Sequence, residues 1–431
     1  MRHPRSLFPV WSLVFLLYSD GCIDPPGQPS SARVLAISHS ALNRLTFFDL
    51  DRNIIVGALP AQKLPHDMLV TENSDTLYVI NSGAQCISTY YPHQPEFWKY
   101  ASAFMQKDSA HLFSRPAPTG TSRNIAGGRK DSLASGEMHS GRVLNPDPVQ
   151  SLPLNIARHF LTDTLFPGIA ARPHAAENAR SHASCYDCHD RSVGGKPFGP
   201  VFNGDRSRIY LVHLAHRTIS ILNARTLAVE REIALDLSSN YSPVAIWINP
   251  HETLAFVTCR NEIGTSQPGV ILVLDLQSAK TRKTIPAGIY PWHLVPDETG
   301  TRLFVNNFQS SRISILDIAA EEIVDSIIVR NGPAMMQLAP GEGRLYISCF
   351  YTDDVLVVNT ATKAVEHVYE VDTNPTSLAL SPDGDKLYVL CGGESSLNVI
   401  DLKAARVTER YPLLFGAYAF QLVHIPASLL P

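Results

Sequence analysis

The chain has 431 residues, 45% hydrophobic and 18% charged, so it can bury a sizeable core and is not disordered as a whole. Its 36 Lys and Arg against 40 Asp and Glu leave a formal charge of −4. That balance excludes the generally basic surface of a protein that coats nucleic acid. Seven Cys, an odd number, are few for a disulfide scaffold.

Residues 1–21 have the pattern of an export signal. Arg2 and Arg5 precede an apolar stretch over 7–18, which is too short to span a bilayer. Cys22 then resembles the lipidated Cys of bacterial lipoproteins, although Ser19 replaces the usual Leu. Residues 22–32 are rich in Pro and Ser, typical of a flexible linker. We expect an exported protein, periplasmic or on the outer surface, that contacts a membrane only through a lipid on Cys22; cleavage without lipidation is the alternative.

Residues 33–91 and 197–426 repeat one pattern of short strands. An apolar strand such as Leu77-Tyr78-Val79 is followed by a second strand ending in Asp or Asn, a more polar third strand, and a fourth opened by Pro. The first strand starts at 35, 77, 209, 254, 303, 345 and 387. Four strands every 42 to 49 residues predict an all-β propeller of seven blades. Residues 417–423 are expected to be the innermost strand of blade one, which closes the ring.

The phrases Leu387-Tyr388-Val389 and Val399-Ile400-Asp401, preceded by Pro375 and by the turn Ser381-Pro382-Asp383-Gly384, resemble the YVTN-type repeat of bacterial and archaeal seven-bladed propellers. The resemblance covers residues 33–91 and 197–424. It implies the propeller fold, and relatives of this type include surface-layer proteins, periplasmic binding proteins and electron-transfer enzymes. Because propellers host unrelated activities, the resemblance does not choose among these functions.

Residues 92–196 interrupt the repeat as an insertion between blades two and three. They contain six Val or Ile in 105 positions, against 22 in the 131 residues from 301 on, so we expect a loop-rich, partly helical stretch without sheet. Its best helix candidate is 152–165. The insertion also holds seven of the sixteen His.

Near the end of the insertion lies the sequence Cys185-x-x-Cys188-His189, the attachment pattern of a c-type haem. Two thiols three positions apart on a helical turn can each bond one haem vinyl group, and the adjacent His then lies under the iron as an axial ligand. We therefore predict one covalent haem c on these residues. A Cys185–Cys188 disulfide or a zinc site shared with nearby His is the alternative.

The motif is expected to follow the outer strand of blade two, so an insertion folded over the rim would hold His189 above the central channel. That rim carries the ends of the Leu-Tyr-Val strands. The sequence does not choose the second iron ligand. Candidates in the insertion are Met105, Met138, His139, His174 and His182, and candidates on the propeller are His213, His66 and His293.

Three further Cys share one repeat position at that rim: Cys259, Cys349 and Cys391. They form either a thiol cluster that binds metal or small buried side chains, as free Cys commonly does. Cys349 and Cys391 could approach within disulfide reach, and Cys86 has no assigned role.

The favoured function is therefore an exported propeller that uses one covalent haem for electron transfer or a haem-linked redox reaction, with a redox protein or a small molecule as partner. The alternative is a non-enzymatic binding or surface scaffold whose Cys185 and Cys188 are structural.

Overall fold

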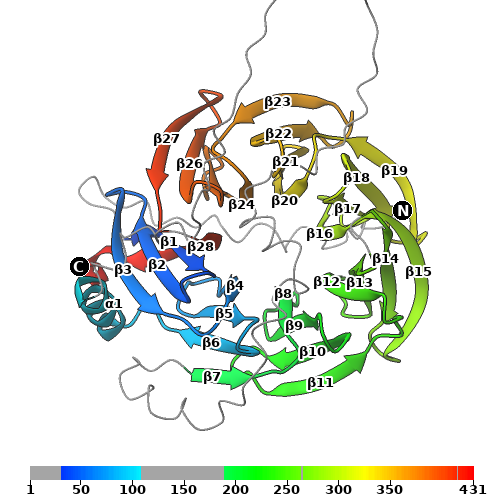
Figure 1. The fold of residues 1–431 in the computed structure, drawn as a ribbon, viewed down its shortest axis with the longest axis horizontal. Helices are drawn as coiled ribbons and strands as arrows, with labels where there is room; N and C mark the ends of the chain where they lie inside the picture. The colour runs from blue at the N-terminus through cyan, green and yellow to red at the C-terminus, as the bar shows by residue number, and fades with distance from the viewer. Residues whose placement is uncertain (1–30, 108–188, 264–265, 415) are drawn as a thin grey trace, which may run out of the picture. The chain divides into compact units, whose positions relative to one another are not determined.

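The computed structural model describes residues 31–107, 189–263, 266–414 and 416–431, which belong to one compact unit. This unit is a β-propeller of seven four-stranded antiparallel sheets around a central axis, as Figure 1 shows. The seven blades expected from the repeat are confirmed. The helix expected over 152–165 lies outside the described residues.

Each blade is a sheet whose four strands follow one another from the axis outward, and the innermost strand is named first. Blade one is β28 (Ala417–Pro426), β1 (Ser31–His39), β2 (Arg44–Asp49) and β3 (Ile54–Pro60). Blade two is β4 (Pro65–Val70), β5 (Leu77–Asn81), β6 (Cys86–Tyr90) and β7 (His189–Ser192). Blade three is β8 (Pro197–Phe202), β9 (Arg208–His213), β10 (Thr218–Asn223) and β11 (Val229–Ala234). Blade four is β12 (Tyr241–Ile248), β13 (Leu254–Asn261), β14 (Pro268–Asp275) and β15 (Lys280–Ile289).

The remaining blades follow the same order. Blade five is β16 (Pro291–Pro296), β17 (Arg302–Asn307), β18 (Arg312–Asp317) and β19 (Glu322–Ile328). Blade six is β20 (Pro333–Ala339), β21 (Arg344–Cys349), β22 (Asp354–Asn359) and β23 (Val365–Glu370). Blade seven is β24 (Pro375–Leu380), β25 (Lys386–Cys391), β26 (Ser396–Asp401) and β27 (Arg406–Pro412). A short 3-10 helix, η2 (Ala427–Leu429), follows β28.

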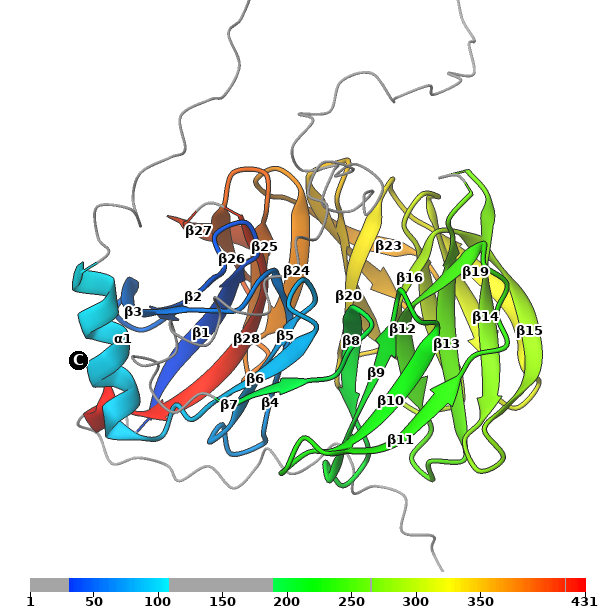
Figure 2. The same ribbon diagram turned by 60° about the horizontal axis from the view of Figure 1, so that its bottom comes forward.

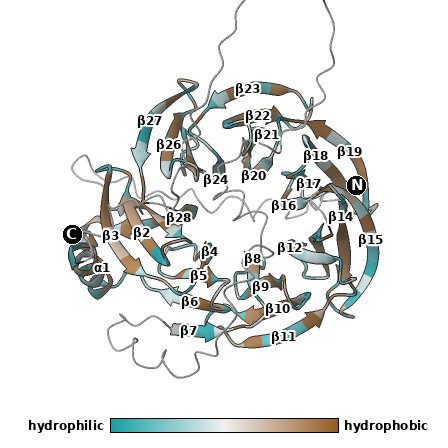
Figure 3. Ribbon diagram, in the orientation of Figure 1, coloured by the Kyte–Doolittle hydropathy of each residue, from teal (hydrophilic) through white to brown (hydrophobic). Residues whose placement is uncertain are grey.

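The strand sequences explain the radial order within a blade. The two middle strands are apolar on both faces because each blade packs between two others; every residue of β5 is buried. Most outermost strands meet solvent, as in β27, whose residues are exposed or half-buried throughout; β3, which α1 covers, is mostly buried. Figure 3 shows β7 as a hydrophilic strand at the perimeter.

The ends of the described chain close the ring. β28 pairs antiparallel with β1 from Ser31↔Pro426 to His39↔Ala417, so the last strand completes the first blade. The contact buries Val34, Val423 and Ile425 in one core cluster with the strands of blade two. The closure predicted from residues 417–423 is therefore confirmed, and it removes two free sheet edges.

One strand of blade two comes from the insertion. Residues 189–192 form β7 and pair with β6 from Thr89↔His189 to Cys86↔Ser192. The expectation that 92–196 contains no sheet is thus wrong at this point. So is the placement of His189 after the outer strand, because His189 begins it. The strand escaped the count of Val and Ile because it lies at the perimeter, where Asp190 and Arg191 are exposed.

The helix α1 (Pro95–Lys107) also falls within the range taken as the insertion, and it belongs to the propeller unit. Its apolar side, formed by Phe97, Trp98 and Ala101, packs on β3 from outside the wheel, as Figure 2 shows. Gly57 of β3 allows this approach, since a Cβ there would lie 2.9 Å from the Cβ of Ala101. The rings of Phe97 and Trp98 meet Phe47 edge-on at 5.2 and 5.3 Å.

Ring closure by β28 gives a prediction on stability. Ile425→Ala removes a fully buried side chain from the closing strand and should lower the free energy of unfolding by about 2–5 kcal/mol. Val365→Ala, at an exposed position of β23, is the matched control and should change it by less than about 0.5 kcal/mol. Urea unfolding followed by circular dichroism measures both, and equal effects would show that the closing contact adds little stability.

Candidate functional site

The seven second strands carry one equivalent position at or near their ends on the same rim. In six blades this residue pairs with a Pro of the innermost strand, as in Pro65↔Asn81 and Pro197↔His213; this Pro opens the strand in five blades and is its third residue in blade four. In blade one His39 pairs with Ala417. We call this edge of the wheel the proline rim. The residues at the position are His39, Asn81, His213, Cys259, Asn307, Cys349 and Cys391.

The His and Asn at this position each bind a hydroxyl group on the neighbouring third strand. His39 Nε2 lies 2.8 Å from Thr46 Oγ1, and His213 Nε2 lies 2.8 Å from Ser220 Oγ. Asn81 and Asn307 donate to the equivalent hydroxyls of Ser88 and Ser314, at 2.8 and 3.0 Å. In all four blades a buried polar side chain is thus hydrogen-bonded to a hydroxyl of the next strand, which is a structural arrangement.

Two of the three Cys blades replace that pair by apolar packing, and in blade seven Asn398 holds the hydroxyl position and donates to Asp372. In the blades of Cys259 and Cys349, the position of the hydroxyl on the third strand is held by Leu272 and Leu356. All three thiols are fully buried, and burial raises the pKa of each. Cys349 and Cys391 are free, not bridged. In the described part of the chain no three His, Cys, Asp or Glu are arranged to hold a metal, so the small-buried-residue interpretation explains these Cys.

The haem-attachment motif meets the described structure at His189. Cys185 and Cys188 lie outside the described residues, whereas the backbone of His189 begins β7 opposite Thr89. β7 is three strands from the innermost β4, which corresponds to about 14 Å at the usual strand spacing. His189 also lies at a different height in the sheet. It is level with Tyr78 of β5, whereas Pro65 pairs with Asn81, three residues further along β5. His189 therefore lies at the perimeter and not above the axis as expected.

The strand that His189 begins is tied to its blade by side chains as well as backbone. Asp190 accepts hydrogen bonds from Ser88 Oγ at 2.6 Å and from Gln62 Nε2 at 2.5 Å. Ser88 in turn accepts from Asn81. A polar chain thus runs from β7 across β6 to β5, and it fixes the backbone at the point where the motif ends.

The other predicted ligands are dispersed. Met105 is a residue of α1 and packs with Ala58 and Leu414. His213 is a poor ligand in this structure because its Nε2 meets Ser220 and its Nδ1 lies 3.1 Å from Gly194 O. Met138, His139, His174 and His182 lie outside the described residues. His66 and His293 come together, but beside the axis and not near β7.

Six residues from four blades form what we call the axial cluster, at the start of the innermost strands. Phe198 of blade three lies 5.3 Å from Trp292 of blade five, centroid to centroid, although blade four stands between them. Contact between non-adjacent blades places these rings near the axis. The members are His66, Asp67, Phe198, Trp292, His293 and Tyr418.

The imidazole of His66 is held between two other rings of the axial cluster. Its centroid lies 4.1 Å from that of Phe198 and 4.0 Å from that of Tyr418. Its Nδ1 lies 3.2 Å from Asp67 Oδ2, the oxygen that also accepts from Gly199 N at 3.1 Å. Gly199 has a φ of +52°, and a Cβ there would lie 2.7 Å from Val244 O, so glycine is required where the amide faces Asp67.

The electrostatics of the axial cluster favour an ionised carboxylate. Burial by itself would raise the pKa of Asp67, but His66, the amide of Gly199 and His293 outweigh it and lower that pKa below its usual value. Burial lowers the pKa of His293 to about 4, so this imidazole is neutral near pH 7. The pKa of Tyr418 is raised well above its usual value by burial and by Asp67.

Sequence reasoning singled out only two of the six members, His66 and His293. The other four carry a signal that could have found them. They occupy the first or second position after the residue that opens an innermost strand, and the equivalent positions of blades four, six and seven hold small or aliphatic residues or Met335. An alignment of the seven repeats at the starts of their innermost strands separates the blades with aromatic or ionisable residues there from the blades without them.

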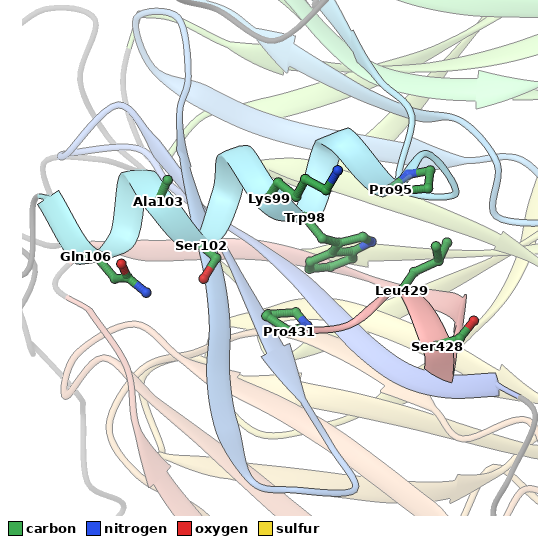
Figure 4. Close-up of a pocket in the computed structure, with 9 residues that line it drawn as sticks. All are labelled: Pro95, Trp98, Lys99, Ser102, Ala103, Gln106, Ser428, Leu429 and Pro431. Carbon is green, nitrogen blue, oxygen red and sulfur yellow. The ribbon is translucent and has the colours of Figure 1, made fainter.

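A separate surface groove of about 450 Å³ lies between α1 and the end of the chain. Figure 4 shows Trp98 of the helix pointing toward Leu429 and Pro431, and Lys99 and Gln106 line the groove from the same helix. The Lys99 ammonium is paired with Glu96 at 2.8 Å, so the groove presents little chemistry. Of the helices in the described ranges, none has the length and apolar character needed to cross a bilayer.

Comparison with known proteins shows the fold alone. No model of a protein family matches the chain, and no curated protein does. A functionally unknown protein from Desulfotomaculum acetoxidans is 11% identical with a TM-score of 0.56, covering 91% of this chain and 99% of that one. The Kuenenia stuttgartiensis hydrazine synthase is 13% identical with a TM-score of 0.54, covering 85% and 92%. Dihydro-haem d1 dehydrogenase NirN is 11% identical with a TM-score of 0.50, covering 88% and 73%.

The shared position of His213 predicts which substitution the protein tolerates. His213→Asn, the residue of blades two and five, should keep the hydrogen bond to Ser220 and stay within about 1 kcal/mol of the wild type. His213→Leu strands that buried hydroxyl and should cost about 1–3 kcal/mol. Unfolding at about pH 7 compares the two, and equal losses would contradict the polar pairing.

The same variant has a pH signature. Burial lowers the pKa of His213, so the unfolded chain takes up a proton near the ordinary value of 6.5 that the folded protein resists. The contribution of neutral His213 to the free energy of unfolding is therefore fully present above about pH 6.5 and is lost as the pH falls below that value. His213→Asn should therefore lose less stability than the wild type between about pH 7 and about pH 5, and an identical slope would contradict this.

The buried thiols predict low reactivity. Burial, with the nearby Asp190, raises the pKa of Cys86 to about 12, and burial likewise raises those of the three rim Cys. Because the thiolate is the reactive form, iodoacetamide should leave these four unmodified in the native protein at about pH 8 and modify them in urea. Peptide mapping by mass spectrometry reads each site, and equal labelling rates in both states would contradict burial.

Proposed function

We propose that this protein is an exported propeller that carries one covalent c-type haem on Cys185, Cys188 and His189, and that it transfers electrons or serves a haem-linked redox reaction. The partner would be a redox protein or a small-molecule substrate. The observation that supports the proposal most directly is the five-residue attachment motif, which continues without a break into β7.

The donor set fits the group. Two thiols and one imidazole within five residues are the groups that a c-type haem needs from its protein, and the backbone of His189 is fixed by pairing with β6. Cys185 and Cys188 would bind the porphyrin edge, and His189 would hold the iron from one side. When bound, the haem supplies an iron that gains or loses one electron. The hydrogen bonds of Asp190 keep the end of the motif in place.

The position of β7 supports a perimeter site in preference to one at the axis. An attachment point at the outer edge of a blade is accessible to a partner protein from outside the wheel, which suits electron transfer better than enclosure. Among the propellers of the same fold, one is described as a dihydro-haem d1 dehydrogenase. That description concerns the other protein, and it supports the proposal only by showing that the fold accommodates haem chemistry.

Export completes the proposal. The signal pattern of residues 1–21 would deliver the chain to the compartment where c-type haem is attached, and Cys22 would carry the lipid if the protein is anchored. Mass spectrometry of the mature protein tests both features at once, since haem and a diacylglycerol group each add a characteristic mass.

The test is a pyridine haemochrome spectrum of protein produced with the haem-attachment machinery. The wild type should retain its haem after denaturation, and Cys185→Ser together with Cys188→Ser should abolish covalent attachment. The circular dichroism of the β-rich propeller should not change, because the two substituted residues precede β7 in the sequence and the β7 residues that pair with β6 are kept.

Cys86→Ala is the matched control, since Cys86 lies in β6 opposite the end of the same strand β7 and should leave the chromophore intact. A wild type without covalent haem would overturn the proposal. It would favour the alternative, a binding scaffold in which Cys185 and Cys188 form a disulfide or a metal site.

A further inference from the structure

The axial cluster contains a carboxylate that is not paired with Lys or Arg. Among the described residues, Asp67 has no Lys or Arg within ion-pair distance, and its near contacts are His66 Nδ1 and the amide of Gly199. The buried guanidinium of Arg260, on blade four, is already paired with Glu262 at 2.7 Å and donates to Tyr290 Oη at 2.5 Å. Among the described residues, the partners of this carboxylate are therefore an imidazole and a backbone amide, with no Lys or Arg beside it.

The imidazole of His293 adds an unused hydrogen-bonding atom. Its Nδ1 is buried and has no hydrogen-bond partner among the described residues. A buried polar atom without a partner costs free energy, so such atoms in folded proteins commonly mark a site that a ligand or an ordered water completes. His293 lies close enough to Asp67 for each to influence the pKa of the other across the axis.

Aromatic faces surround these polar groups. Phe198, Trp292 and Tyr418 come from three blades, and Trp292 stacks on Tyr290 at 5.7 Å with an interplanar angle of 18°. Solvent reaches the polar side chains of the axial cluster, because the side chains of Asp67 and His66 are 24% and 14% exposed. Aromatic faces beside a carboxylate attract cations, since the ring quadrupole presents a negative face.

We propose that the axial cluster binds a protonated amine with a flat apolar substituent. The ammonium donates to the carboxylate of Asp67 and to Nδ1 of His293, and the apolar part lies on the ring faces of Phe198 and Trp292. An anion is disfavoured because it would meet Asp67 with no free cation beside it. This site is independent of the haem proposed at β7, since a different set of residues forms it.

The test is isothermal titration calorimetry of the full-length exported protein with 2-phenylethylamine and its uncharged isostere 2-phenylethanol at about pH 7. We expect the amine to bind at least about tenfold more tightly, because a charge-assisted hydrogen bond is stronger than a neutral one. Quenching of Trp292 fluorescence should follow the same affinity and be absent in Trp292→Phe. Equal affinities, or no binding of the amine, would overturn the proposal without any variant.

The variant Asp67→Asn tests whether the carboxylate of Asp67 binds the ammonium group. It keeps an acceptor for Gly199 N and should weaken amine binding at least about tenfold while leaving 2-phenylethanol unchanged. Glu394→Gln removes an equal charge from a residue just beyond β25 and is the matched control, with unchanged affinity expected. Undiminished amine binding by a folded Asp67→Asn protein would refute the assignment.

The double variant Cys185→Ser with Cys188→Ser separates this inference from the proposed function. Amine binding should persist in it with unchanged affinity, so a missing haem and a missing amine site are distinct results. Loss of amine binding in this variant would contradict an independent axial site.

Discussion

The pairing of β28 with β1 is the contact on which the rest of the structure depends. It joins residues nearly four hundred positions apart into one sheet and turns a row of seven blades into a ring. Each innermost strand then packs against the next, from β4 through β28 and back to β4. A blade on its own exposes two apolar faces, whereas the closed ring buries both faces of every blade. At the perimeter, β27 faces solvent along its length, whereas β3 is covered by α1.

Ring closure also sets the chemistry of the proline rim. Because every blade has the same register, seven side chains arrive at equivalent places, and the protein fills them in two ways. Blades one, two, three and five use His or Asn with a hydroxyl group, as in His213 with Ser220. Blades four and six use Cys against Leu, and in blade seven Asn398 turns instead to Asp372. Small buried Cys side chains pack beside Leu in blades four and six, so the repeated Cys need no metal to explain them.

The fold could be predicted from the sequence because the repeated middle strands are strongly apolar and evenly spaced. The seven blades and the closing strand followed from that pattern. β7 could not be found in the same way, since His189–Ser192 has no apolar residue and gains its structure from pairing with β6. The helix α1 was missed because it has no Val or Ile and is recognised only by the stripe of Phe97, Trp98 and Ala101 on β3.

The candidate sites differ in the same respect. A haem-attachment motif is local, so Cys185, Cys188 and His189 were visible in the sequence, but their place in the wheel was not. The axial cluster is non-local: His66 and Tyr418 touch only because the ring closes, and no sequence window contains both. Repeats aligned at the openings of the innermost strands would have shown which blades carry aromatic or ionisable residues there.

Blade two connects the two candidate sites. β4 carries His66 and Asp67, and β7 begins with His189, with two hydrogen-bonded strands between them. The strands that carry the two sites lie about 14 Å apart at the usual strand spacing. Between them, Asp190, Ser88 and Asn81 form a continuous polar chain from β7 to β5. That chain stops at Asn81, which pairs with Pro65 through the backbone and does not bond to Asp67. The geometry therefore favours two sites that act independently on one rigid sheet.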